Sequence, residues 1–415
     1  MARCKVYKKF ENKGGMGYYD EMRRIYLDYA AATPPDTRAL KVMNDTSKKF
    51  YGNPSSLHLE GQEAKKSLEN ARGIIAGTIS AHPNEIIFTS GATEANNMAI
   101  RGVVSMARER GIKNPHIIIS AIEHPSILEV AEALQKEGVS VSRLSVDHRG
   151  TVNAKELRKL INENTVLVSV MYANNEIGTV EPIRDIAKEI RHARKTNNSS
   201  YPYFHTDGAQ AANYLDLNVL KLGVDLMTIS SGKTYGPRGI GALFVRRGII
   251  LQPLLQGGEH ESGRRAGTEG VALAVGFAEA LILAEKIKTK EYARVKKLRD
   301  NLAEKILKKI PDCVINGDIE NGLPNILNIS VAGCDSEALV IYLDAIGIAV
   351  SGKSSCKSSD RSPSHVIMAL GGNDSGTIRF SLGRNTKKED IARVAQELPR
   401  IIALLRACHT QSDQV

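Results

Sequence analysis

Tryptophan is absent from the 415-residue sequence, and aromatic residues make up only 5% of it. Proteins that bind single-stranded nucleic acid stack its bases on aromatic side chains, and the sequence also lacks a groove-reading motif. The formal net charge of +10 attracts acidic partners, but Lys and Arg are spread along the whole chain. We therefore interpret the charge as a solvated basic surface and expect no nucleic-acid partner.

Long apolar runs are also missing. The longest, GVALAVGFAEALILAE from Gly270, is interrupted by Glu279 and is too short to span a bilayer, so we interpret it as a packed helix. The first two dozen residues contain acidic side chains and no apolar core of signal-peptide length. They form either a flexible arm or a stretch before a natural start at Met22, and we expect a cytoplasmic protein with no membrane contact.

Cysteine is scarce. Cys4, Cys313, Cys334, Cys356 and Cys408 are an odd number, widely spaced, with no CxxC pair. This spacing indicates neither a disulfide framework nor a thiolate metal site, and it favours a reducing compartment. We expect no metal.

Short β-rich runs alternate with helical patterns from about residue 85 to 247, namely EIIF, HIIIS, TVLVSVMY, YFHTD, DLMTIS and GALFVRR. This alternation predicts an α/β domain with a largely parallel sheet, whose ligands bind at the carboxyl ends of the strands. A helix from about Gly270 to Ile310 follows. The later strands NILNISV and IRFSL mix with helices and predict a second, smaller α+β domain.

One candidate anion site lies in FTSGATEANNMAI, where a strand ends at Ser90 and a helix begins near Ala92. The backbone N–H groups of a helix start and the hydroxyl of Thr93 can donate to an anion. A Ser or Thr in this place is more often a simple N-cap, so the motif alone is weak.

Two further residues suggest a pyridoxal site. Asp207 ends the strand of HTDGAQ, and Lys233 follows 26 positions later in ISSGKTYGP. A carboxylate can pair with a protonated pyridine nitrogen, and a lysine amine can hold an aldehyde as a Schiff base. The GKT triplet is not a phosphate-binding loop, because that motif needs a glycine at position 227, which is Met. A plain surface lysine remains the alternative.

A third candidate is Cys356, in the Ser-rich segment AVSGKSSCKSSDRSPS between Lys353 and Lys357. Nearby positive charge favours the thiolate, and small polar neighbours leave it accessible as a nucleophile. Arg379 in TIRFSLG has the planar fork that binds a carboxylate, and His124 follows the strand HIIIS. Each of the last two is, by itself, more often structural.

Together these segments resemble the cysteine desulfurases, through YLDYAAATP, GNPSSLH, FTSGATEANN, EHPSI, NNEIGTV, HTDGAQ, GKTYGPRGIGA, GGEHESGRRAGTEG, the Cys356 segment and IRFSLGR. The match runs from about Ile25 to Arg406, and ten such motifs in the family's order do not co-occur by chance. The resemblance implies the fold of class V aminotransferases, fold type I, with a mostly parallel seven-stranded sheet. It also implies a homodimer that binds pyridoxal 5′-phosphate.

The resemblance assigns domains as well. Residues 1–24 are an N-terminal extension, and residues 39–289 form the large cofactor-binding domain. Residues 25–38 and 290–415 form the small domain, which carries the catalytic cysteine.

The cofactor contacts are likewise carried over from the resemblance. Lys233 would hold pyridoxal phosphate covalently and later act as the base, His124 would stack on its ring, and Asp207 would pair with the ring nitrogen. Gln210 and Asn175 would hold the phenolic oxygen and the substrate side.

The phosphate would be bound by Ala92, Thr93 and Ser230, and by Thr268 from the other subunit. Arg379, helped by Asn175, would hold the carboxylate of L-cysteine. Cys356 would then collect the sulfur as a persulfide, leaving alanine, and pass it to an acceptor protein such as a scaffold for iron–sulfur clusters.

Two positions depart from the family. Gly232 stands where a His usually precedes the lysine, so one phosphate hydrogen bond is missing, and Lys353 replaces a small residue. A selenocysteine lyase or another β-lyase of the same fold is the nearest alternative, and Cys356 argues against it. A non-catalytic sulfur-transfer scaffold is a second, which has no need of Lys233, His124 and Arg379 together.

Overall fold

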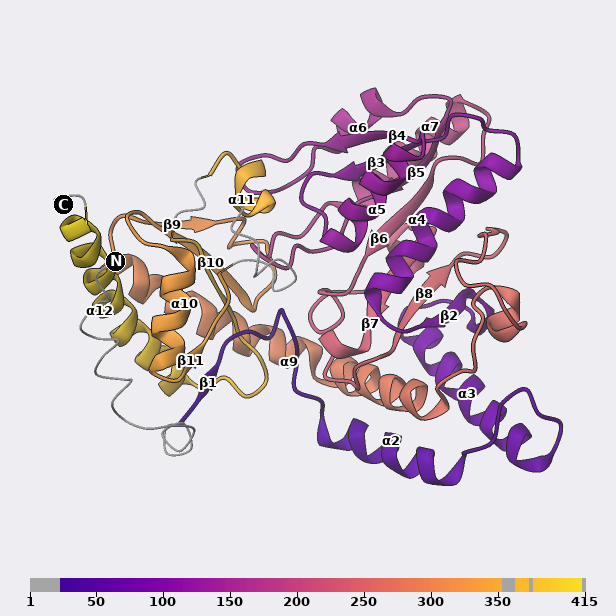
Figure 1. The fold of residues 1–415 in the computed structure, drawn as a ribbon, viewed down its shortest axis with the longest axis horizontal. Coiled ribbons are helices and arrows are strands. Elements are labelled where there is room, and N and C mark those ends of the chain that lie inside the picture. The colour runs from indigo at the N-terminus through magenta and orange to yellow at the C-terminus, as the bar shows by residue number, and fades with distance from the viewer. Residues whose placement is uncertain (1–22, 353–362, 373–375, 413–415) are drawn as a thin grey trace.

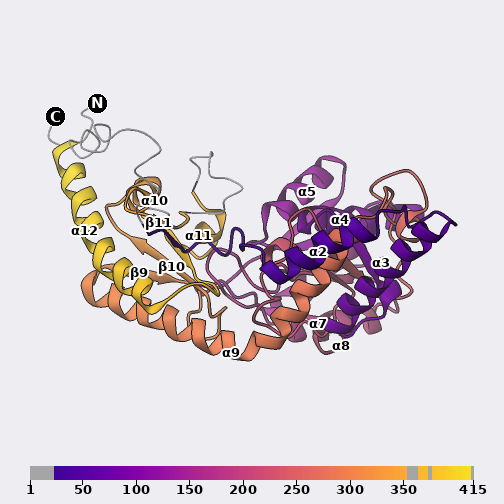
Figure 2. The ribbon, with the colours of Figure 1, turned by 90° about the horizontal axis from the view of Figure 1, so that it is seen from below.

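A computed structural model describes residues 23–352, 363–372 and 376–412. Two regions of sheet stand at opposite ends of the molecule, and one long helix, α9 (Val271–Lys309), runs beneath both (Figures 1 and 2). The extension of residues 1–22 and the segment with Cys356 lie outside the described residues.

The larger region is a seven-stranded sheet in the order β2-β8-β7-β6-β5-β3-β4. Only β8 runs antiparallel to its neighbours, so the α/β prediction and the mostly parallel sheet are confirmed. Its strands are β2 (Ile86–Thr89), β3 (His116–Ser120), β4 (Ser140–Leu144), β5 (Thr165–Ser169), β6 (Tyr203–Asp207), β7 (Leu226–Ser230) and β8 (Gly241–Val245). β3, β5, β6 and β8 are buried along their whole length, as expected for strands covered on both faces.

Helices cover both faces of this sheet. One apolar core joins one face to α3 (Leu59–Thr78), α7 (Ile183–Thr196), α8 (Val219–Leu222) and the first half of α9. A second core joins the other face to α4 (Ala92–Glu109) and α5 (Pro125–Lys136). α2 (Thr37–Lys49) packs on α9, and α6 (Ala154–Leu160) packs on α7. Short 3-10 turns are η2 (Pro83–Glu85), η3 (Ser231–Lys233) and η4 (His260–Gly263).

The smaller region has its own core around an antiparallel sheet, β12-β10-β9, and a parallel pair, β1-β11. The strands are β1 (Ile25–Tyr26), β9 (Cys313–Asn316), β10 (Ile326–Val331), β11 (Ile348–Ala349) and β12 (Ile378–Ser381). The helices of this region are α10 (Ser336–Ala345) and α12 (Lys388–Ser412). The short helix α11 (His365–Ala369) packs instead on residues that follow β3 and β5 of the large sheet. The predicted strands NILNISV and IRFSL are confirmed as β10 and β12.

The chain passes between the two regions after β1 and again along α9. β1 pairs with β11, 323 positions later in the sequence, before the chain enters the large sheet. The second half of α9 belongs to the small core, so the predicted domain boundary at residues 289–290 falls inside one continuous helix.

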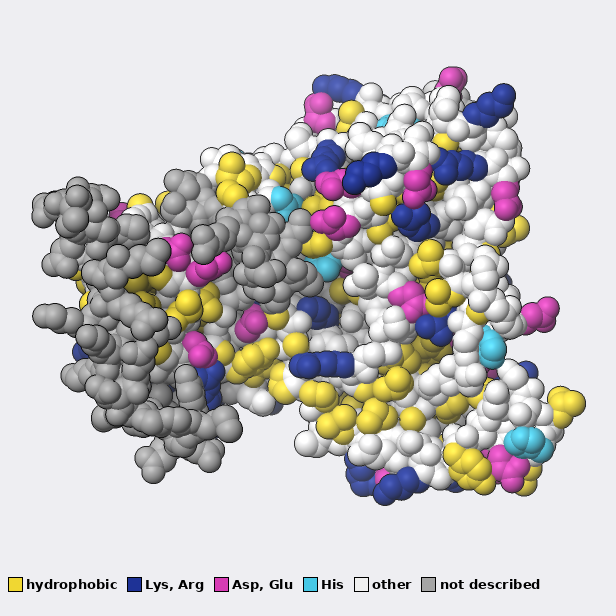
Figure 3. All heavy atoms as spheres, in the orientation of Figure 1, with side chains coloured by type: hydrophobic (Ala, Val, Ile, Leu, Met, Phe, Trp, Pro, Cys, Tyr) yellow, Lys and Arg dark blue, Asp and Glu magenta, His cyan; other side chains and the backbone are white. Residues whose placement is uncertain are grey.

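The surface charge is mixed. On the face shown in Figure 3, Lys and Arg side chains lie interspersed with Asp and Glu over the large sheet region. Within the described part of the chain, no helix is both long and apolar enough to cross a membrane.

Candidate active site

A pocket of about 310 Å³ lies at the carboxyl ends of the parallel strands. The turns that follow β2, β3, β5, β6 and β7 all reach it, because these five strands run in the same direction. The small region closes it with the turn after β1 and with Arg379 from β12. Its lining is Ala30, Ala31, Ser90, Gly91, Ala92, Thr93, Glu94, His124, Met171, Ala173, Asn175, Asp207, Ala209, Gln210, Ser230, Lys233 and Arg379.

The structure thus brings together nearly all of the residues singled out in the sequence. Two predicted residues are not in the lining. Thr268 is described and exposed but is not among the lining residues, and Cys356 lies outside the described residues. The individual roles assigned to these side chains remain predictions.

The Lys233 amine is held by backbone oxygens. Its Nζ donates to the carbonyl oxygens of Ala30 at 2.8 Å and Ala31 at 2.5 Å. Gln210 donates to the same Ala30 oxygen at 2.9 Å. The amine is therefore half-buried and pointed into the pocket by the turn after β1, and it is not a solvated surface lysine.

A chain of hydrogen bonds connects Asp207 to His124. Asn96 Nδ2 donates to Asp207 Oδ2 at 2.8 Å and to Ser126 Oγ at 2.9 Å. Ser126 Oγ lies 2.9 Å from Nδ1 of His124, which caps α5. The backbone N–H of Ala209 donates to the other carboxylate oxygen of Asp207. These contacts hold the Asp207 carboxylate in place at the end of β6.

Burial lowers the pKa of His124; the Asp207 carboxylate opposes this shift, and the Lys233 amine and His365 add to it. The imidazole is thus neutral at neutral pH and offers an uncharged ring face. Burial also lowers the pKa of His205, on β6, to about 4. Burial, reinforced by the negative charge of Asp207, raises the pKa of Glu123 to about 8.

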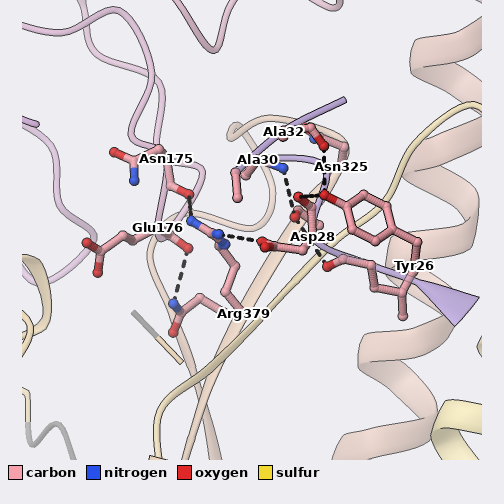
Figure 4. A network of polar contacts seen from close by, with 12 residues as sticks. Tyr26, Asp28, Ala30, Ala32, Asn175, Glu176, Asn325 and Arg379 are labelled. Atoms are coloured by element: carbon pink, nitrogen blue, oxygen red, sulfur yellow. Dashed lines mark hydrogen bonds and ion pairs between the residues drawn. The ribbon is translucent and has the colours of Figure 1, made fainter. Parts of the chain in front are cut away.

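Arg379 is fully buried and paired on two sides (Figure 4). Its Nη2 lies 2.7 Å from Asp28 Oδ1, and its Nη1 donates to the carbonyl oxygen of Asn175 at 2.8 Å. Its Nε is buried without a hydrogen-bond partner among the described residues. A buried unpaired donor is costly, so this nitrogen is suited to a ligand acceptor.

The turn before α4 forms the other end of the pocket. The first N–H groups of a helix have no partner within the helix, which makes Ala92 and Thr93 suitable donors to an anion. The Glu94 carboxylate accepts from the Ser90 N–H and pairs with Arg265 at 2.7 Å. Burial favours the neutral form of Glu94, but these hydrogen bonds outweigh it and hold its pKa below the usual value.

Gly232, the residue before Lys233, has room for a side chain to begin. A Cβ at this position would meet its nearest neighbour, Arg238 Cγ, at 3.6 Å, which is an ordinary contact. Steric crowding at Cβ is therefore not the reason that position 232 is a glycine.

Sequence reasoning missed three residues: Asn96, Ser126 and Asp28. Each lies within a motif that carried the resemblance, but their roles depend on partners 30 to 351 positions away. Asn96 alone gave a signal, because it is a polar residue on the buried face of an amphipathic helix.

Two other cysteines, Cys313 and Cys334, lack the exposure and the low thiol pKa of a nucleophile. Cys313 and Cys334 are buried, and burial raises the thiol pKa of Cys313 to about 11 and also raises that of Cys334. Both thiols stay protonated at neutral pH. No cluster of three or more His, Cys, Asp or Glu side chains in the described ranges could hold a metal ion.

The model of the aminotransferase class-V family matches residues 25–394. The sequence is 43% identical over 387 residues to the cysteine desulfurase IscS of Dictyoglomus turgidum, covering 92% of this chain and 96% of that protein. The structure superposes on a NifS-like protein with a TM-score of 0.84 and 33% identity, covering 92% of this chain and all of that one. It is also similar to SspA solved in complex with cysteine, with a TM-score of 0.74 and 33% identity over 86% of this chain and 98% of that one.

Proposed function

The chain belongs to the aminotransferase class-V family, and on this premise we propose that it is a cysteine desulfurase that uses pyridoxal 5′-phosphate. One observation carries the proposal: Lys233, Asp207 and Arg379 converge on a single pocket in a chain that is 43% identical to a cysteine desulfurase. The substrate is L-cysteine, and the products are L-alanine and a persulfide on Cys356.

The residues of the pocket fit this cofactor. Its volume of about 310 Å³ lies in the range of small-molecule sites. Asp207 supplies a fixed carboxylate for the ring nitrogen, neutral His124 supplies a ring face, and the start of α4 supplies donors for the phosphate. Lys233 supplies the amine that binds the aldehyde. When bound, pyridoxal phosphate acts as an electron sink for charge that develops at the substrate's Cα.

Each side chain then has one task toward the substrate. Arg379 binds the carboxylate of L-cysteine, using donors that Asp28 and Asn175 leave available, and so places Cα next to Lys233. Lys233 Nζ moves the proton at Cα, and the carbonyl oxygens of Ala30 and Ala31 hold the amine when it carries the extra proton.

The sulfur atom then moves from the substrate to Cys356. The Cβ–S bond of cysteine breaks, a new S–S bond forms with the Cys356 sulfur, and the former Cβ becomes the methyl group of alanine. The Cys356 thiol loses its proton and Cβ gains one, so one cysteine and one thiol give one alanine and one persulfide. A protein acceptor, of the kind that assembles iron–sulfur clusters, then takes the outer sulfur.

The proposed enzyme is a cytoplasmic homodimer. Thr268 is exposed in the single chain and lies on the same segment as Arg265, which pairs with Glu94 beside the phosphate end of the pocket. This arrangement supports a role for Thr268 in the site of a second copy.

The test measures alanine and sulfide released from L-cysteine with a thiol reductant present. We expect equal amounts of both from the wild type and none from Lys233→Ala, which also loses the yellow colour of the bound cofactor. Cys356→Ala should keep the colour but lose turnover. Full activity in Cys356→Ala would show instead a direct β-lyase, and a colourless wild type that takes up no cofactor would favour a scaffold.

A further inference from the structure

α11 is the short helix that follows the segment with Cys356, and it is bound to the wall of the pocket. Val366 and Ile367 are buried in a cluster with Ile122, Met171 and Ile177, which come from the turns after β3 and β5. Although α11 lies late in the chain, its apolar contacts are therefore with the large sheet region.

A buried hydrogen bond fixes the start of this helix. Ser364 caps α11 and is 4% exposed. Its hydroxyl donates to Glu176 Oε2 at 2.6 Å. Glu176 is itself 3% exposed, and it directly follows Asn175, whose carbonyl oxygen binds Arg379.

A second hydrogen bond lies one residue further on. His365 Nε2 is 2.9 Å from the carbonyl oxygen of Glu123, and because a carbonyl can only accept, Nε2 carries the hydrogen. Glu123 directly precedes His124. The Glu123 side chain in turn accepts from the N–H of Met171, another residue of the pocket lining.

The chain before the Cys356 segment is attached to the same pocket. Ser351 exchanges two backbone hydrogen bonds with Arg379, of 2.7 and 3.3 Å. Ser351, which precedes the Cys356 segment, is thus hydrogen-bonded to Arg379, and Ser364 and His365, which follow it, are hydrogen-bonded to the chain neighbours of Asn175 and His124.

We propose that Ser364 and His365 are positioning residues for sulfur transfer, which fix the end of the Cys356 segment relative to the bound substrate. The proposal rests on the desulfurase function. Transfer needs the attacking and donor sulfurs in close alignment, and a misplacement of about 1 Å can cost on the order of 100-fold in rate. Neither residue lines the pocket, so their loss should change the sulfur step and leave substrate binding intact.

The experiment uses the cofactor-loaded enzyme and the variants Ser364→Ala and His365→Ala. Persulfide on Cys356 is followed by mass spectrometry in a single turnover with L-cysteine. We expect the rate of persulfide formation to fall by about ten-fold or more, while the spectral change on cysteine binding keeps its wild-type concentration dependence. His365→Gln, whose amide can donate to the Glu123 carbonyl, should recover most of the rate.

The matched control is Ser330→Ala. Ser330 also makes side-chain hydrogen bonds, but its partners are Asn316 and Thr377, and it lies on β10 of the small sheet. It should keep the wild-type rate of persulfide formation. Wild-type rates in both Ser364→Ala and His365→Ala would overturn the proposal.

A second readout separates this proposal from the desulfurase assignment. The rate at which iodoacetamide alkylates Cys356, measured without cysteine, depends on how the segment is held and not on turnover. We expect this rate to change in Ser364→Ala and His365→Ala and to stay at the wild-type value in Ser330→Ala. If the wild type forms no persulfide, the desulfurase assignment fails, and unchanged alkylation in both variants then overturns the positioning role as well.

Discussion

The buried ion pair between Asp28 and Arg379, which the sequence alone did not predict, should contribute to the free energy of unfolding. We consider Asp28→Asn, which keeps the size of the side chain and one oxygen acceptor but removes the negative charge. The Arg379 side chain is 2% exposed and that of Asp28 is 20% exposed, with 2.7 Å between Nη2 and Oδ1. The substitution therefore leaves a buried guanidinium without its countercharge.

The size of the effect follows from the burial of the two partners. Removing one partner of a fully buried pair costs about 3–5 kcal/mol, whereas an exposed pair contributes about 0–1 kcal/mol. Asp28 is partly exposed and the amide oxygen can still accept from Arg379, so the expected cost lies between these two limits and below the fully buried value. We expect Asp28→Asn to reduce the free energy of unfolding by about 2–3 kcal/mol.

The assay is urea unfolding of the cofactor-free protein, so that cofactor binding does not enter the comparison. Asp45→Asn is the matched control, because Asp45 pairs with Lys41 at 2.6 Å but the two side chains are 59% and 76% exposed. The control should lose less than about 1 kcal/mol. A loss in Asp28→Asn no larger than in Asp45→Asn would refute the reasoning from burial.

Three further outcomes can be measured. The raised pKa of Glu123, about 8, means that the folded protein keeps a proton that the unfolded chain releases near pH 4.5, so stability falls as pH rises from 5 to 8. Glu123→Gln should make urea unfolding less pH-dependent, by up to about 1.4 kcal/mol per pH unit, and an unchanged slope would contradict a buried neutral carboxyl. Gly232→His should bind pyridoxal phosphate at least about ten-fold more tightly than the wild type in a titration, because the imidazole can donate to the phosphate. Gly232→Ala adds no donor and should bind it as the wild type does. Cys313 and Cys334 should resist iodoacetamide at pH 7 until urea is added, and rapid labelling of the folded protein would contradict their raised pKa values.

Much of the large sheet could be predicted because its strands are buried on both faces. β3, β5 and β8 are continuous apolar runs bounded by polar turns, and such runs stand out in a sequence. β4 was missed, since SVSRL is an edge strand with one buried residue and no apolar run. β1 and β11 were missed for another reason: each has two residues, and they exist only because they pair across the chain.

The candidate site divides in a similar way. Lys233, Asp207 and Arg379 could be named because their chemistry is distinctive and their motifs match a family. Asp28 and Asn96 could not be assigned a role, because the role of a short polar side chain depends on its hydrogen-bond partner, and both partners are far away in the sequence. Thr268 is the opposite case: its predicted role needs a second subunit, and the single chain leaves it exposed.

The turn of residues 28–32 links two events that the proposed reaction must coordinate. The Asp28 side chain holds Arg379, which meets the substrate carboxylate, and the carbonyl oxygens of Ala30 and Ala31 hold the amine of Lys233. The Tyr26 hydroxyl lies 2.9 Å from the carbonyl oxygen of Asp28 and 2.8 Å from that of Ala32, so its single hydrogen is shared between the two ends of the turn (Figure 4). Because one turn holds both the Arg379 guanidinium and the Lys233 amine, its conformation affects the distance between the carboxylate site and the amine. The turn of residues 28–32 thus connects Arg379, from the small sheet, with Lys233, from the large sheet, in one pocket.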